Sequence, residues 1–127
     1  MKIYFARSIR GQIGVAVQEL QSSLHIFGEV LAENFDYSKN ESRDQQIYAQ
    51  DMALLARADV VIAEVSNPSL GVGYEIATAE RLGKPILALA KEGVLVSAMV
   101  AASPHVVLKR YVSISDAHAH IRAFLKK

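Results

Sequence analysis

Glu75 stands at the end of a segment whose order of parts is typical of ligand sites in α/β proteins. The segment reads ADVVIAEVSNPSLGVGYE from Ala58 to Glu75. Its nearly continuous apolar run suits a parallel strand covered on both faces, and ligands collect outside the carboxyl ends of such strands. Ser69, Gly71 and Gly73 follow the strand and offer a hydroxyl and accessible backbone N–H groups where a helix should start, which favours an anion. The segment therefore predicts a phosphate-and-sugar site that contains one carboxylate.

Two interpretations of Glu75 fit its position. The glycines at 71 and 73 disfavour a helix interior, so we expect the helix to begin near Gly73 and to carry Glu75 in its first turn. The positive end of the helix would help to keep this carboxylate ionised. A carboxylate there can also do no more than stabilise the helix N-terminus. The spacing leaves both interpretations open, and the neighbouring glycines favour a functional role.

Asp51 is the second candidate, because it lies on the apolar stripe of a predicted helix over Ile47–Arg57. It comes four residues after Ile47 and three and four residues before Leu54 and Leu55. Partial burial would raise the pKa of this carboxyl and make it a proton donor beside a second, ionised carboxylate. The alternative is an Asp at the edge of the stripe that caps a loop or pairs with an arginine.

A second turn with possible anion ligands follows the first predicted strand. It consists of Arg7, Ser8, Ile9, Arg10 and Gly11. A hydroxyl, an arginine fork and a glycine amide before a helix can cradle a monophosphate. The turn matches neither GxGxxG nor the P-loop pattern, so those classes lose support. The alternative is a solvated turn with two incidental arginines.

Several other chemistries find no support in the sequence. Tyr4 lies inside the first predicted strand, where an aromatic is more often part of the core than a catalytic phenol. The four histidines do not form a ligand set, no cysteine is present, and no GxSxG surrounds a serine. We therefore expect neither a metal nor a cofactor, and neither thiolate nor serine-nucleophile chemistry.

The composition indicates one domain over residues 1–127 without a strong electrostatic preference for partners. The chain is 51% hydrophobic and 21% charged, with a formal net charge of +1. A balance this even does not favour a nucleic-acid polymer or an anionic membrane as partner. The apolar stretch near the N-terminus is too short for the core of a signal peptide, and no apolar stretch approaches membrane-spanning length. We expect a soluble, cytoplasmic protein.

Predicted strands and helices alternate along the chain, which is the pattern of a doubly wound sheet. The fold class expected is α/β, with a five-stranded parallel sheet of the Rossmann or flavodoxin-like kind flanked by helices. A long polar stretch, Glu33–Gln46, is expected to be a lid or binding loop. The predicted strands are 2–6, 29–32, 58–65, 85–90 and 105–109, and the predicted helices are 12–27, 47–57, 74–82, 94–102 and 113–124.

Three blocks of the sequence resemble the 2'-deoxynucleoside 5'-phosphate N-hydrolase family, within the nucleoside 2-deoxyribosyltransferase superfamily. IYFARSIRG resembles the family's first strand and turn, and QDMALLARADVVIAEVSNPSLGVGYE resembles its central block almost throughout. GKPILAL and LVSAM resemble its fourth strand and the helix after it. The blocks extend from Ile3 to about Met99, and the central block is long enough to be specific.

The resemblance implies cleavage of the N-glycosidic bond of a 2'-deoxynucleoside 5'-monophosphate, giving a free base and 2-deoxyribose 5-phosphate. Glu75 matches the family's nucleophile, so retaining chemistry through a covalent glycosyl-Glu intermediate is implied. Asp51 matches the acid that protonates the departing base and then activates water. Tyr4 matches the tyrosine that orients the nucleophile.

The resemblance also implies a substrate-binding set and a homodimer, in which Ser97 reaches the site of the neighbouring subunit. This chain departs from the family pattern at Arg7 and Gln12, where the family has glycine, and at Tyr48, where relatives carry histidine. A deoxyribosyltransferase and a non-catalytic nucleotide-binding domain stay open as alternatives. The implied substrate-binding residues are Ser8, Ile9, Arg10, Gly11, Ser69, Gly71, Gly73, Ser97 and Met99.

Overall fold

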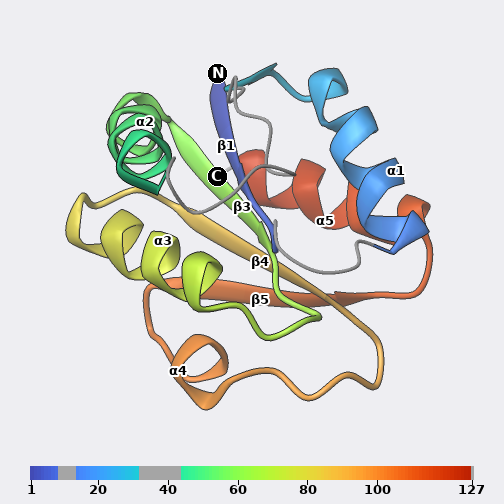
Figure 1. Cartoon of the computed structure of the whole chain (residues 1–127). Helices are drawn as coiled ribbons and strands as arrows, with labels where there is room; N and C mark the ends of the chain where they lie inside the picture. The colour runs from blue at the N-terminus through green and yellow to red at the C-terminus, as the bar shows by residue number, and fades with distance from the viewer. Residues whose placement is uncertain (9–13, 32–43, 127) are drawn as a thin grey trace.

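The chain folds around one all-parallel sheet of five strands (Figure 1). The computed structural model describes residues 1–8, 14–31 and 44–126. The spatial order is β2-β1-β3-β4-β5, which is the flavodoxin-like order of doubly wound sheets. The predicted fold class is therefore confirmed. The strands are β1 (Lys2–Ala6), β2 (Glu29–Val30), β3 (Val60–Glu64), β4 (Ile86–Lys91) and β5 (Val106–Tyr111).

Helices cover both faces of the sheet, as Figure 1 shows. One face carries α1 (Val15–Ser23), the short 3₁₀ helix η1 (Leu24–Ile26) and α5 (Ile114–Leu125), whereas the other face carries α2 (Asp44–Arg57) and α3 (Leu70–Arg81). A short helix, α4 (Ala98–Ala101), lies against β5. In the described part of the chain, no helix is both long and apolar enough to cross a membrane.

The two helical layers explain the apolar character of the central strands. All five residues of β3 are buried, and its four apolar residues alternate between two hydrophobic cores. Val61 and Ala63 pack under α2 and α3, while Val60 and Ile62 pack under α1 and α5. Because helices cover both faces of this strand, neither face contacts solvent, and residues on both faces are apolar. This explains the continuous apolar run in the sequence.

The predicted start of α3 is wrong by three residues. The helix begins at Leu70, because the Ser69 hydroxyl accepts a hydrogen bond from the Val72 N–H at 3.2 Å and caps the first turn. Gly71 and Gly73 therefore lie inside the helix, and Glu75 lies in its second turn. The capping bond outweighed the low helix propensity of two glycines.

The other boundaries differ modestly from the predicted ones. β2 is limited to two residues, α2 begins at Asp44 within the stretch predicted as a loop, and α4 spans four residues. The first helix gives way to η1 at Leu24, and β5 extends to Tyr111. Most of the predicted lid, residues 33–43, lies outside the described residues.

Glycine at two positions permits turns that other residues would not. Gly83 has φ +70 directly after α3, a left-handed conformation that ends the helix. A Cβ at Gly28 would lie 2.6 Å from the backbone oxygen of Met1, so only glycine allows the chain to enter β2 here.

Candidate active site

The connections that follow β1 and β3 diverge at the carboxyl edge of the sheet. These strands are neighbours, with Ala6 opposite Ala63, but the chain leaves β1 toward β2 and leaves β3 toward β4. Ligands in open α/β sheets bind where the connections diverge in this way. The turn with Ser8 and the turn with Ser69 both leave the sheet at this edge, so the structure brings the two predicted anion-binding turns to the same side of the molecule.

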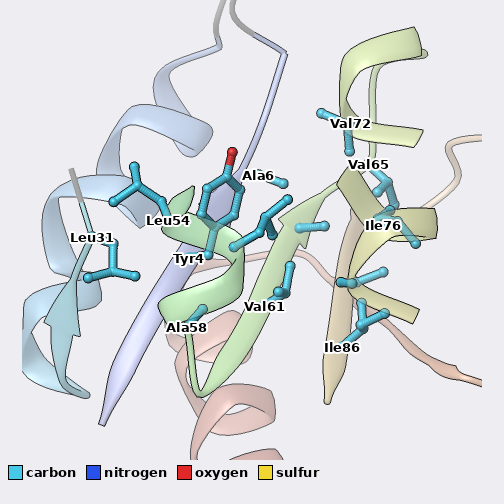
Figure 2. Close-up of a cluster of buried hydrophobic side chains, with 14 of the residues drawn as sticks. Tyr4, Ala6, Leu31, Leu54, Ala58, Val61, Val65, Val72, Ile76 and Ile86 are labelled. Atoms are coloured by element: carbon cyan, nitrogen blue, oxygen red, sulfur yellow. The ribbon is translucent and has the colours of Figure 1, made fainter. Parts of the chain in front are cut away.

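Tyr4 of β1 and Glu75 of α3 are in direct contact. The Tyr4 hydroxyl donates a hydrogen bond to Oε2 of Glu75, although the residues are 71 positions apart in the sequence. Tyr4 is 3% exposed, and its ring lies among apolar side chains with the hydroxyl oxygen directed away from Ala58 and Val61 (Figure 2). The ring is thus a core residue, as its place in a strand predicts, and the hydroxyl is a polar group aimed at a carboxylate.

The start of α3 carries two glycines with space around them. Among the described residues outside the backbone of α3, a Cβ built at Gly73 would meet no atom within 4 Å, and one at Gly71 would meet the Ser69 hydroxyl at 3.8 Å. Ser69 is half-buried, whereas both glycines are exposed. The small residues therefore keep the surface between the Ser69 cap and Glu75 low, which allows close approach of a ligand.

Asp51 lies on α2, the helix that packs beside α3. It is half-buried, and its Oδ1 atom is shielded from solvent. The rings of Tyr48 and Tyr74 make an edge contact at a centroid distance of 6.1 Å, which shows where the two helices touch. Tyr48 precedes Asp51 by one helical turn and Tyr74 precedes Glu75 directly. The two carboxylates thus belong to helices that are in contact near the level of these residues.

Only part of the first anion-binding turn lies within the described residues. The Arg7 guanidinium donates to the backbone oxygen of Ser8 at 3.1 Å, which folds the arginine back onto its own turn. Ile9, Arg10 and Gly11 lie outside the described residues, as does Gln12. Their predicted contacts with phosphate stay predictions.

Ser97 caps α4 and lies on the surface. Its hydroxyl accepts from the Met99 N–H at 3.3 Å, and Ser97 and Met99 are both exposed. Leu95 next to them is 93% exposed and Met99 is 84% exposed. An exposed cap with two large apolar neighbours is compatible with a contact to another chain, and the predicted contribution to a neighbouring site stays a prediction.

Sequence reasoning missed a buried polar group behind the site. Glu64 is 4% exposed and accepts a hydrogen bond from the Tyr111 hydroxyl at 2.6 Å. Burial, followed by the hydrogen bond and the charge of Glu64, raises the pKa of Tyr111. The signal was available, because a glutamate interrupts an otherwise apolar strand.

The described histidines serve the packing of helices and turns. His118 Nε2 lies 2.7 Å from the Ser23 hydroxyl between α5 and α1, and His120 donates to the backbone oxygen of Arg110. Burial, with a smaller contribution from Arg122, lowers the pKa of His118. Within residues 1–8, 14–31 and 44–126, no group of three His, Cys, Asp or Glu residues could hold a metal ion.

The sheet order and the tyrosine–glutamate pair define a class: doubly wound α/β proteins with a carboxylate beside the switch point of the sheet. Comparison with known proteins specifies the family. The model of the nucleoside 2-deoxyribosyltransferase family matches residues 3–107. The chain therefore belongs to this family.

Curated relatives agree with this assignment, and a solved structure shares the fold. A Syntrophotalea carbinolica protein assigned to the 2'-deoxynucleoside 5'-phosphate N-hydrolases is 42% identical over 125 residues, covering 91% of this chain and 88% of that protein. The 5-hydroxymethyl-dUMP N-hydrolase of Mus musculus is 43% identical over 109 residues, covering 77% of this chain and 63% of that protein. The CMP N-glycosidase BcmB of Clostridium botulinum shares the fold, with a TM-score of 0.70 at 18% identity and coverage of 96% of this chain and 99% of that chain.

Proposed function

We propose that the protein hydrolyses the N-glycosidic bond of 2'-deoxynucleoside 5'-monophosphates. The products are the free base and 2-deoxyribose 5-phosphate. The observation that carries the proposal is the hydrogen bond from Tyr4 to Glu75 at the switch point of the sheet. The N-hydrolase names of relatives at about 40% identity support the reaction class.

In the first half-reaction, a carboxylate oxygen of Glu75 attacks C1' of the sugar. The C1'–N bond breaks, and its electron pair leaves with the base, which takes a proton from Asp51. The product is an ester between Glu75 and 2-deoxyribose 5-phosphate. Tyr4 orients the attacking carboxylate by donating a hydrogen bond to Oε2.

In the second half-reaction, water attacks the same carbon. Asp51, now a carboxylate, accepts the proton of this water, and Glu75 leaves as a carboxylate. Two displacements at C1' retain the configuration of the sugar. The ordinary residues of the chain suffice for every step, so the scheme calls for neither a metal nor a cofactor.

The 5'-phosphate is bound by the two turns at the carboxyl edge of the sheet. Ser8, Ile9, Arg10 and Gly11 supply one side and Ser69 supplies the other, with Gly71 and Gly73 allowing the sugar to lie close to α3. The helix N-terminus capped by Ser69 adds a favourable field for the anion. The exposed Ser97, Leu95 and Met99 support a homodimer in which Ser97 and Met99 complete the neighbouring site.

One assay separates this proposal from its two rivals. The protein is incubated with deoxynucleoside monophosphates and with unphosphorylated nucleosides, with and without an acceptor base, and free base and exchanged nucleoside are followed. The proposal is supported if the protein hydrolyses the monophosphates and does not hydrolyse the unphosphorylated nucleosides. Base exchange would identify a deoxyribosyltransferase, and binding without turnover a nucleotide-binding domain. Ribonucleotides serve as the control for sugar preference, and Glu75→Ala as the control for the nucleophile.

A further inference from the structure

Glu64, the last residue of β3, carries a buried carboxylate with three hydrogen-bond donors around it. Its Oε1 accepts from the Ser66 N–H at 2.9 Å. Its Oε2 accepts from the Ser66 hydroxyl at 2.9 Å and from the Tyr111 hydroxyl at 2.6 Å. Glu64, Ser66 and Tyr111 are each less than 10% exposed. We call these three residues the Glu64 cluster.

The direction of each bond in the Glu64 cluster follows from its chemistry. The backbone N–H of Lys91 can only donate, and it donates to the Ser66 hydroxyl oxygen at 2.9 Å. The Ser66 proton is then available for Glu64, as is the Tyr111 proton. An acceptor-only group suits all three donors, and a carboxylate is such a group.

The cluster connects the carboxyl ends of three adjacent strands. Glu64 ends β3, Lys91 ends β4 and Tyr111 ends β5. Ser66 lies in the turn that leads to the Ser69 cap, only three residues further on. The geometry of this turn decides where α3 starts, and therefore where Glu75 stands relative to Tyr4.

A carboxylate is an unusual choice for stability alone at this position. The other four residues of β3 are apolar, and removing a charge from water costs several kcal/mol before hydrogen bonds offset it. An apolar side chain could fill the same space under α1 and α5, but it could not accept the Ser66 N–H. Only an acceptor at residue 64 holds the first residues of the turn in this shape.

We propose that Glu64 is a positioning residue of the active site, which acts through Ser66 to fix the turn that presents Ser69 and starts the helix of Glu75. It does not contact the substrate, because its side chain lies on the face of the sheet opposite to the Tyr4–Glu75 pair. This inference rests on the proposed function, since it assigns Ser69 to phosphate and Glu75 to the sugar.

The test compares variants that break different bonds of the cluster. Glu64→Gln replaces one acceptor oxygen by an NH2 donor group, so the side chain can no longer accept from both Ser66 groups, and Ser66→Ala removes the hydroxyl that joins Glu64 to the Lys91 N–H. Tyr111→Phe removes a donor from the same carboxylate without touching the turn. Ser66→Thr keeps the hydroxyl and serves as the rescue. For each variant, the melting temperature is measured first, and KM and kcat for a deoxynucleoside monophosphate are then measured well below it.

We expect Ser66→Ala and Glu64→Gln to lower kcat/KM by roughly 10- to 100-fold, with a raised KM and a lowered kcat, because small misplacements of site residues are costly. Tyr111→Phe should stay within about threefold of wild type even where its melting temperature falls, and Ser66→Thr should restore most of the activity. Should Glu64→Gln fail to fold, Ser66→Ala and its threonine rescue decide the question.

Two outcomes would overturn the inference. In one, Ser66→Ala keeps the wild-type kcat/KM. In the other, the loss of activity follows the loss of thermal stability across all variants, with Tyr111→Phe affected as strongly as the rest. Failure of the proposed function is separate, because wild-type protein would then release no base. In that case the same variants are compared for inorganic phosphate binding by NMR titration, where weaker binding in Ser66→Ala but not in Tyr111→Phe supports the inference and equal binding overturns it.

Discussion

The hydroxyl of Tyr4 in β1 donates a hydrogen bond to the carboxylate of Glu75 in α3. The ring is held by the apolar core on the α2 and α3 face of the sheet, so the hydroxyl has little freedom. A rigid donor fixes one oxygen of the carboxylate and orients the other. This contact therefore brings Tyr4 of β1 and Glu75 of α3 into one site.

Removing the Tyr4 hydroxyl should affect catalysis more than stability. We expect Tyr4→Phe to lower kcat by about 10- to 100-fold with little change in KM, because a positioned donor acts on the reacting carboxylate. The free energy of unfolding should fall by no more than about 1.5 kcal/mol, since the ring still fills the core. Steady-state kinetics and urea unfolding measure the two effects. Tyr111→Phe, which removes a second buried phenol, is the control, and an equal loss of kcat in both variants would contradict the role of Tyr4.

The loss of kcat on substitution of Asp51 should be larger for a substrate with a poorer leaving group. We expect Asp51→Asn to lower kcat for natural deoxynucleoside monophosphates by roughly 100- to 10,000-fold, because an amide cannot protonate the base. A substrate analogue with a 4-nitrophenolate leaving group on 2-deoxyribose 5-phosphate needs no such proton and should be cleaved at a rate nearer to wild type. Asp59→Asn is the matched control, since Asp59 lies at the amino edge of the sheet and binds the Lys2 N–H at 2.7 Å. Equal losses on both substrates would argue against Asp51 as the acid.

Arg7 stands where the family pattern has glycine, and its charge favours a phosphate contact. Arg7→Gly should raise KM for the nucleotide more than it lowers kcat, by a factor of about ten for one charged hydrogen bond. Phosphate-free nucleosides should show no such change, since they lack the group that the arginine attracts. An unchanged KM for the nucleotide would contradict this interpretation.

The start of α5 should make stability depend on acid pH. The backbone N–H groups of Val112 and then Ser113 lower the pKa of Asp116 from its ordinary 3.8, as the hydrogen bonds favour the charged form. A depressed pKa in the folded state stabilises the protein above 3.8, and this stabilisation disappears as the pH falls through the folded value. The urea midpoint of Asp116→Asn should therefore lie below that of wild type at pH 7 and approach it at low pH. Ser113→Ala, which removes an N-cap that does not itself titrate, should show a deficit with a much weaker pH dependence, since the Ser113 side chain is the smallest of the causes that lower the pKa of Asp116.

The strand and helix pattern was predictable because the sheet is buried on both faces. Continuous apolar runs such as Val60–Ala63 predicted strands correctly. The spacing of Ser113 and Asp116 correctly predicted the N-terminus of α5, where the two residues form a capping box. The start of α3 was not predictable from glycine propensity, since a single cap at Ser69 decides it. The Ser69 cap is also a local signal, so this boundary was missed because glycine propensity was given more weight than the cap.

The candidate site was predictable as a set of residues but not as an arrangement. Tyr4 and Glu75 were both singled out, yet their hydrogen bond depends on strand order and on the register of β1 with β3. Glu64 escaped notice because its partner Tyr111 is 47 residues away in the sequence. Long-range pairing of this kind follows from the packed fold, which no local pattern specifies.

The most direct test of the account is a search for the covalent intermediate on Glu75. Wild-type protein is mixed with a deoxynucleoside monophosphate, quenched in acid within the first turnover and digested, and the peptide that contains Glu75 is analysed by mass spectrometry. The account predicts a 2-deoxyribose 5-phosphate adduct on Glu75, absent from Glu75→Ala, which should also release no base. Full base release by Glu75→Ala, or an adduct on a different residue, would contradict it.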